Sequence, residues 1–177
     1  MKNMILYKMF KNLTLNNALS KEEKAQIYFD EATKLCEELT RNELQGLNIC
    51  GYTYTTTEAV NELGLDDELV NQLVEDYVIQ ILKTASLFAQ HLQTLHEAKQ
   101  NSQELDYTPL RELAHKNLGV ARNLRIRDGE ALLHELMIKD DLEYLDRCLH
   151  ALKACAIRLK PLCAFNTLKL MEVKSII

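Results

Sequence analysis

Apolar residues recur at helical spacing along most of the chain, and this pattern predicts a series of helices. Apolar positions three or four residues apart fall on one face of a helix, and such spacing covers residues 21–44, 67–98, 110–124, 129–138 and 142–159. No stretch of any length alternates with the period of two that a half-buried strand would show. The pattern therefore predicts an all-α protein.

Residues that can cap a helix precede the predicted helices and indicate where each one begins. Two capping boxes, each a Ser or Thr followed three residues later by Glu, precede residues 21–44 and a short helix at 58–63. Gly64 is expected to close the short helix in a left-handed conformation. Pro109 fits the first turn of the helix around residues 110–124. The residues expected to cap helices are Ser20, Thr55, Asp66, Thr108 and Asp128, and the last main helix is expected to start in the run Asp140-Asp141-Leu142-Glu143.

A loop rich in Thr and Tyr at residues 45–57 is the best candidate for a boundary. We expect residues 1–57 to form an N-terminal helical extension and loop, residues 58–160 to form a four-helix bundle, and residues 161–177 to form a C-terminal helical tail packed on the bundle. Short connections make successive helices antiparallel, so an up-down arrangement is the simplest product. The extra N-terminal helix either packs on the bundle or offers a surface for partners or dimerisation.

The helix at residues 110–124 is predicted to expose a histidine beside a bare patch. At about 100° per residue, His115 falls almost opposite the apolar stripe, and Gly119 follows one turn later on the same outer face. A glycine inside a helix costs about 0.5–1 kcal/mol relative to Ala. Its presence there makes room beside the imidazole. The predicted apolar stripe consists of Leu110, Leu113, Val120, Ala121 and Leu124.

The residues around His115 resemble the motif of histidine phosphotransfer (HPt) domains. The active helix of that family reads roughly His-x-Leu-Lys-Gly-Ser-Ala-x-Asn-Leu-Gly. The resemblance covers about residues 58–160 and implies an antiparallel up-down four-helix bundle, in which the exposed His carries a phosphoryl group and the Gly lets a response-regulator surface approach. The residues that match the motif without gaps are His115, Gly119, Ala121, Asn123 and Leu124.

Four positions depart from the motif. The family's Lys is Leu118 here, its apolar residue two after the His is Asn117, its Ser is Val120 and its closing Gly is Arg125. Asn117 falls near the centre of the predicted apolar stripe, so it needs a hydrogen-bond partner.

Basic residues near His115 are candidates to supply the positive charge of the missing Lys. Arg125 and Arg127 extend this basic patch just beyond the helix, and it would complement a partner site lined by carboxylates. The candidate partner-docking and phosphoryl-supporting residues are Gly119, Arg111, Lys116, Leu118 and Arg122.

The resemblance implies a role in phosphorelay signal transduction. His115 would carry a phosphoryl group between a histidine kinase or receiver domain and a response regulator, and Mg²⁺ would come only with the partner. An exposed imidazole offers a neutral nitrogen nucleophile at pH 7, and transfer is mainly positioning and charge neutralisation. One alternative is a degenerate HPt-like scaffold that binds receiver domains or other proteins without being phosphorylated. Another is an unrelated helical interaction module with an incidental surface His115.

Composition and motifs argue against other classes of protein. The net charge of −5, without a basic tail, does not favour nucleic-acid binding. The apolar run at the N-terminus is broken by Lys8 and has no cleavage site, so we expect a cytoplasmic protein with no membrane segment. The five cysteines include no C-x-x-C pair, and Cys148 and Cys155 are expected to pack in the core. We expect no metal site, no cofactor and no catalytic site of the protein's own.

Overall fold

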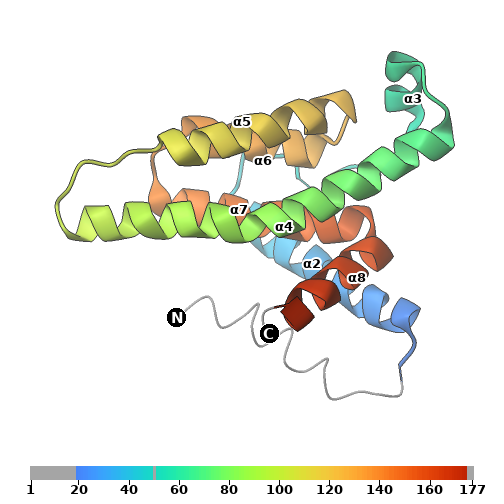
Figure 1. The fold of residues 1–177 in the computed structure, drawn as a ribbon, viewed down its shortest axis with the longest axis horizontal. Coiled ribbons are helices and arrows are strands. Elements are labelled where there is room, and N and C mark those ends of the chain that lie inside the picture. The colour runs from blue at the N-terminus through green and yellow to red at the C-terminus, as the bar shows by residue number, and fades with distance from the viewer. Residues whose placement is uncertain (1–18, 50, 175–177) are drawn as a thin grey trace.

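The computed structural model describes residues 19–49 and 51–174, and this part of the chain is entirely helical (Figure 1). It contains seven helices and no strand, so the predicted all-α class is confirmed for these residues. None of the described helices has the length and apolar character needed to cross a membrane. The helices are α2 (Lys21–Asn42), α3 (Thr57–Leu63), α4 (Asp67–Gln100), α5 (Thr108–Asn123), α6 (Arg127–Ile138), α7 (Leu142–Leu159) and α8 (Pro161–Lys174).

Helix α7 lies at the centre of the packing. It contacts α2, α4, α6 and α8, and α5 packs between α4 and α6 (Figure 1). One continuous apolar core includes buried residues from all seven helices. The side chains of α7 are buried on most of its circumference, as expected for a helix with neighbours on several sides.

Helix α2 is packed into the same core as the helices that follow it. Ala25, Tyr28, Ala32 and Cys36 are buried, and α2 contacts α7 and α8. The ring of Tyr28 meets Phe165 of α8 edge to face, with 5.5 Å between the ring centroids. The described part of residues 1–57 therefore shares its core with the rest of the chain. Residues 1–18 and Cys50 lie outside the described residues.

Several predicted caps are confirmed. Ser20 and Glu23 form a reciprocal capping box, and the Asp66 carboxylate accepts the Leu69 N–H at 2.8 Å. Gly64 ends α3 with a φ of 67°, in the left-handed region. At α7 the cap is Asp141, which lies within the predicted start, and it accepts the Tyr144 N–H.

Three predicted caps are wrong. The box expected from Thr55 does not form, because Thr56 precedes α3 and donates its hydroxyl to the Asp67 carboxylate, a charged acceptor. Thr108 lies inside α5, and its N–H is satisfied by Asp106 at 2.9 Å. Asp128 lies inside α6 and is buried, so its carboxylate is not available to cap that helix.

The buried face of α5 is rotated from the predicted stripe by about 40°. Leu110 and Ala121 are buried as expected, but Leu113 and Val120 are only half-buried, and Leu118 takes a core position with 2 % of its surface exposed. Because α5 packs against both α4 and α6, its buried face follows those two helices rather than the most apolar arc of its sequence.

Asn117 is a polar residue in the core, and both ends of its amide are hydrogen-bonded. It is 1 % exposed. Its Nδ2 donates to the Leu113 carbonyl at 2.8 Å, and its Oδ1 accepts from Gln80 Nε2 of α4 at 2.8 Å. The predicted need for a partner is met by a hydrogen bond that joins α4 to α5.

Replacing Asn117 with Ala is expected to lower the free energy of unfolding by about 1–3 kcal/mol, because the substitution removes both hydrogen bonds and leaves a small void. Asn123→Ala, at an exposed position of the same helix, serves as the control and is expected to change stability by less than about 0.5 kcal/mol. Urea unfolding followed by circular dichroism measures both. Equal stability of the two variants would contradict the structural role of Asn117.

Candidate functional site

His115 lies on the solvent-facing side of α5, and the surface one turn after it is open. Its side chain is exposed, as is Gly119. A Cβ built at Gly119 would meet no neighbouring side chain within 4 Å. Residues four apart on a helix lie side by side, so the imidazole borders a patch without side-chain bulk. A partner surface can approach this nitrogen nucleophile closely.

Two of the three cations proposed to assist His115 are engaged in ion pairs. The Arg111 guanidinium lies 2.5 Å from the Asp140 carboxylate and 5.1 Å from the centre of the Tyr107 ring. The Arg122 Nε donates to Glu130 at 2.8 Å. Both Arg side chains remain partly exposed.

Lys116 and Leu118 differ sharply in where they lie. Lys116 is exposed next to His115 and forms no ion pair with any residue that the structure describes. Leu118 points into the core, so its predicted role in docking is wrong. Leu118 is buried because the buried face of α5 is rotated from the predicted apolar stripe, so that it includes position 118.

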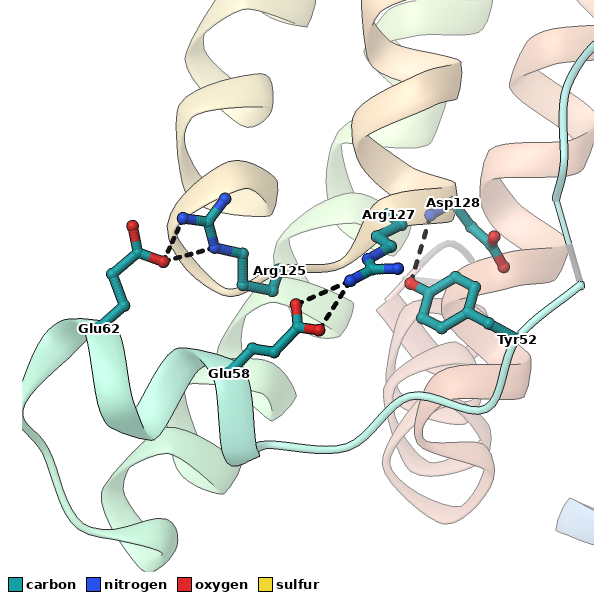
Figure 2. A network of polar contacts seen from close by, with 6 residues as sticks. All are labelled: Tyr52, Glu58, Glu62, Arg125, Arg127 and Asp128. Carbon is teal, nitrogen blue, oxygen red and sulfur yellow. Dashed lines mark hydrogen bonds and ion pairs between the residues drawn. The ribbon is translucent and has the colours of Figure 1, made fainter.

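Helix α3 neutralises the two arginines beyond α5 (Figure 2). Arg125 Nε donates to the Glu62 carboxylate at 2.5 Å, and a nitrogen of Arg127 lies 2.7 and 3.0 Å from the two oxygens of Glu58. The hydrogen bond from Arg125 lowers the pKa of Glu62. The sequence predicts a basic patch here, but the acidic residues that neutralise it come from a helix more than sixty residues earlier.

The segment before α3, residues 52–56, contacts the chain where α5 ends and α6 begins. The Tyr52 ring lies 5.8 Å from the Arg127 guanidinium, and its hydroxyl accepts the Asp128 N–H at 3.3 Å (Figure 2). Burial raises the pKa of the Tyr52 hydroxyl. Tyr54 adds a second contact by donating to the Leu124 carbonyl at 2.9 Å.

Behind this segment lies a cavity of about 430 Å³. The Arg158 guanidinium lies 3.9 Å from the Asp128 carboxylate, and the Lys160 ammonium donates to Asn71 at 2.7 Å. Sequence reasoning missed the cavity, because it is built from the 52–56 segment and four helices, and because Asp128 was expected to cap α6. Its lining includes Phe29, Tyr52, Asn71, Asp128, Cys155 and Arg158.

The remaining histidines do not form a metal site. No group of three possible metal ligands occurs among the residues that the structure describes. His96 pairs with Asp146 of α7 at 2.8 Å. His150 is half-buried, and burial lowers its pKa.

The chain was compared with protein-family models, with curated proteins and with solved structures, and none of them matches it. A functional conclusion therefore depends on the geometry of α5 and on the motif around His115.

Arg125 stands where the HPt motif has its closing Gly, and it has a φ of 57°. A left-handed conformation costs an L-residue about 1–2 kcal/mol, and it is harder still for a β-branched side chain. We expect Arg125→Val to be less stable than Arg125→Gly by about 1–2 kcal/mol in urea unfolding. Both variants lose the ion pair with Glu62, so the difference between their stabilities measures the cost of the positive φ. Equal stability would show that this position does not require positive φ.

Proposed function

We propose that this protein is a phosphorelay carrier in which His115 accepts a phosphoryl group from a histidine kinase or receiver domain and passes it to a response regulator. The observation that carries the proposal is the pairing of an exposed His115 with the open surface at Gly119, one turn later. The resemblance of the surrounding residues to the HPt motif indicates that the chemistry is phosphoryl transfer. An all-helical fold gives the histidine a rigid support.

We infer that α4, α5, α6 and α7 form an antiparallel up-down four-helix bundle, with α2 as an additional N-terminal helix and α8 as a C-terminal tail. The contacts support this arrangement, because α4 packs against α5 and α7, and α6 packs against the same two helices. The connections within this set are short, which favours antiparallel neighbours. In such a bundle the outer face of α5 presents His115 to solvent.

The transfer itself requires little catalytic machinery from the carrier. A neutral ring nitrogen of His115 attacks the phosphorus of an aspartyl phosphate on the receiver. The N–P bond forms as the P–O bond to the carboxylate breaks, and the electron pair of that bond stays with the departing carboxylate. Mg²⁺ held by the receiver neutralises the phosphoryl oxygens. The carrier's contribution is to position the nucleophile and keep the approach open.

Lys116 is the best candidate among the local cations to support the phosphoryl group. Arg111 and Arg122 already neutralise Asp140 and Glu130, so drawing them to a phosphoryl group would break an ion pair. Lys116 has no such pair among the described residues and adjoins His115 on the exposed side of α5. Its flexible stem lets the ammonium reach toward the neighbouring imidazole.

One observation favours the second candidate, a scaffold that binds receivers without being phosphorylated. The family's Lys position is Leu118 here, and its side chain is in the core. No cation therefore projects from the position that the motif reserves for one. The two candidates share a docking face and differ only in whether His115 is phosphorylated.

We expect the wild-type chain to accept label from a phosphorylated receiver domain in the presence of Mg²⁺, and His115→Gln to accept none. The label should be acid-labile, as phosphohistidine is. Because His115 is exposed, His115→Gln should unfold at the same temperature as the wild type. The measurement is autoradiography of the labelled chain after gel electrophoresis.

His134→Gln is the matched control for this experiment, because His134 is a partly exposed histidine on the neighbouring helix α6. It should be labelled like the wild type. Label that persists in His115→Gln would refute the assigned site. A receiver that binds the wild type without labelling it would favour the scaffold.

The open surface at Gly119 makes a separate prediction. Gly119→Ala should raise the free energy of unfolding by about 0.5–1 kcal/mol, because Ala favours a helix and its Cβ meets no neighbour. Gly119→Trp should fold but slow phosphoryl transfer by about tenfold or more, since a partner loses 1.4 kcal/mol or more of its contact energy. Single-turnover transfer kinetics measure the rate.

Glu38→Trp places the same bulk at an exposed position of α2, a helix that packs against α7 and α8. It should leave the transfer rate unchanged. Equal effects of the Trp at both positions would show that partner docking does not involve the surface around Gly119.

A further inference from the structure

Two buried thiols from different helices face each other inside the core. Cys36 comes from α2 and Cys155 from α7, and their sulfur atoms are 3.7 Å apart. Cys36 is fully buried, and 7 % of Cys155 is exposed. A disulfide needs about 2.05 Å between the sulfurs, so each side chain has to move by less than about 1 Å. The two helices already pack against each other, so no rearrangement of the fold is required.

The cavity described above provides a route to this pair. Cys155 lines it, together with Arg158 one turn later on α7. The cavity holds about 430 Å³, and a water molecule needs a share of only about 30 Å³. A small oxidant such as hydrogen peroxide can therefore reach Cys155. The thiolate is the reactive form of a cysteine, and the Arg158 guanidinium that pairs with Asp128 lies at the same cavity.

We propose that Cys36 and Cys155 are a peroxide-sensitive thiol pair, which closes to a disulfide that joins α2 to α7. The inference concerns a site other than His115 and does not depend on the proposed phosphotransfer. It rests on the 3.7 Å separation of the two sulfurs and on the cavity that Cys155 lines.

The reaction balances in two steps. The Cys155 thiolate attacks one oxygen of hydrogen peroxide, so an S–O bond forms as the O–O bond breaks, and the departing hydroxide takes up the proton that the thiol released. The Cys36 sulfur then attacks the Cys155 sulfenic acid, so the S–S bond forms as the S–O bond breaks, and a second water leaves with the Cys36 proton. The two sulfurs lose two electrons, and the peroxide gains them.

The other described cysteines are less suited to this reaction. Neither Cys148 nor Cys163 lies within hydrogen-bonding reach of another sulfur among the described residues. Cys148 is on the same helix as Cys155 and is equally part of the core, which makes it a matched control.

The test uses the full chain, oxidised by hydrogen peroxide under native conditions and then alkylated in denaturant. The wild type should lose two alkylatable thiols, and peptide mapping without reductant should find Cys36 joined to Cys155. The disulfide closes a long loop, so the oxidised protein should melt about 5–10 °C higher, and reductant should reverse the shift. Cys148→Ser should still form the same linkage.

Two variants distinguish formation of the sulfenic acid at Cys155 from formation of the disulfide with Cys36. Cys36→Ser should form no linkage, but dimedone should trap a sulfenic acid at Cys155. Cys155→Ser should yield neither product. Loss of thiols from the wild type without a Cys36–Cys155 peptide, or a linkage through another cysteine such as Cys50, would overturn the proposal. So would a linkage that forms only in denaturant, because it would show that the native cavity does not admit the oxidant.

Discussion

The burial of one face of α5 between α4 and α6 is the constraint on which the candidate site depends. Once Leu110, Leu118 and Ala121 are in the core, the opposite side of the helix has to face solvent. That requirement places His115 and Gly119 outside, one turn apart. The hydrogen bond between Asn117 and Gln80 adds a directional contact between α5 and α4, which apolar packing alone does not provide. The orientation of the histidine is thus set by residues that never touch it.

The charge around α5 is set by acidic residues from outside this helix, two of them more than sixty residues away in the sequence. Viewed along the chain, five cations on and after this helix form a basic patch. In the folded protein Asp140, Glu130, Glu62 and Glu58 neutralise four of them, from three different parts of the chain. Such exposed pairs contribute little stability. The pairs matter more for the distribution of charge around His115. They leave Lys116 as the unpaired cation beside it among the described residues.

The sequence predicts the helices well because helical periodicity and caps are local signals. The all-α class, the capping box at Ser20 and the left-handed Gly64 follow from residues within a few positions of each other. The failures have non-local causes. Leu118 is buried because α5 has two neighbouring helices, and Asp128 is buried beside Arg158, which is thirty residues later. The cavity and the Cys36–Cys155 contact depend on how α2 meets α7, and no local pattern encodes that.

Gly119 on α5 and Arg125 just beyond it are each a residue type that the local backbone conformation disfavours. Gly119 is a poor helix former in the middle of an exposed helical face, where an Ala side chain would meet nothing. Arg125, just beyond the helix, has the positive φ that favours Gly. Folding alone would favour the reverse choice at each site. At Arg125 the side chain has an evident partner, since it binds Glu62 of α3. At Gly119 no contact with another described residue explains the cost, because an added Cβ would meet nothing within 4 Å there. A residue that weakens its helix and whose added Cβ would meet no neighbour among the described residues fits the proposed approach of a partner surface next to His115.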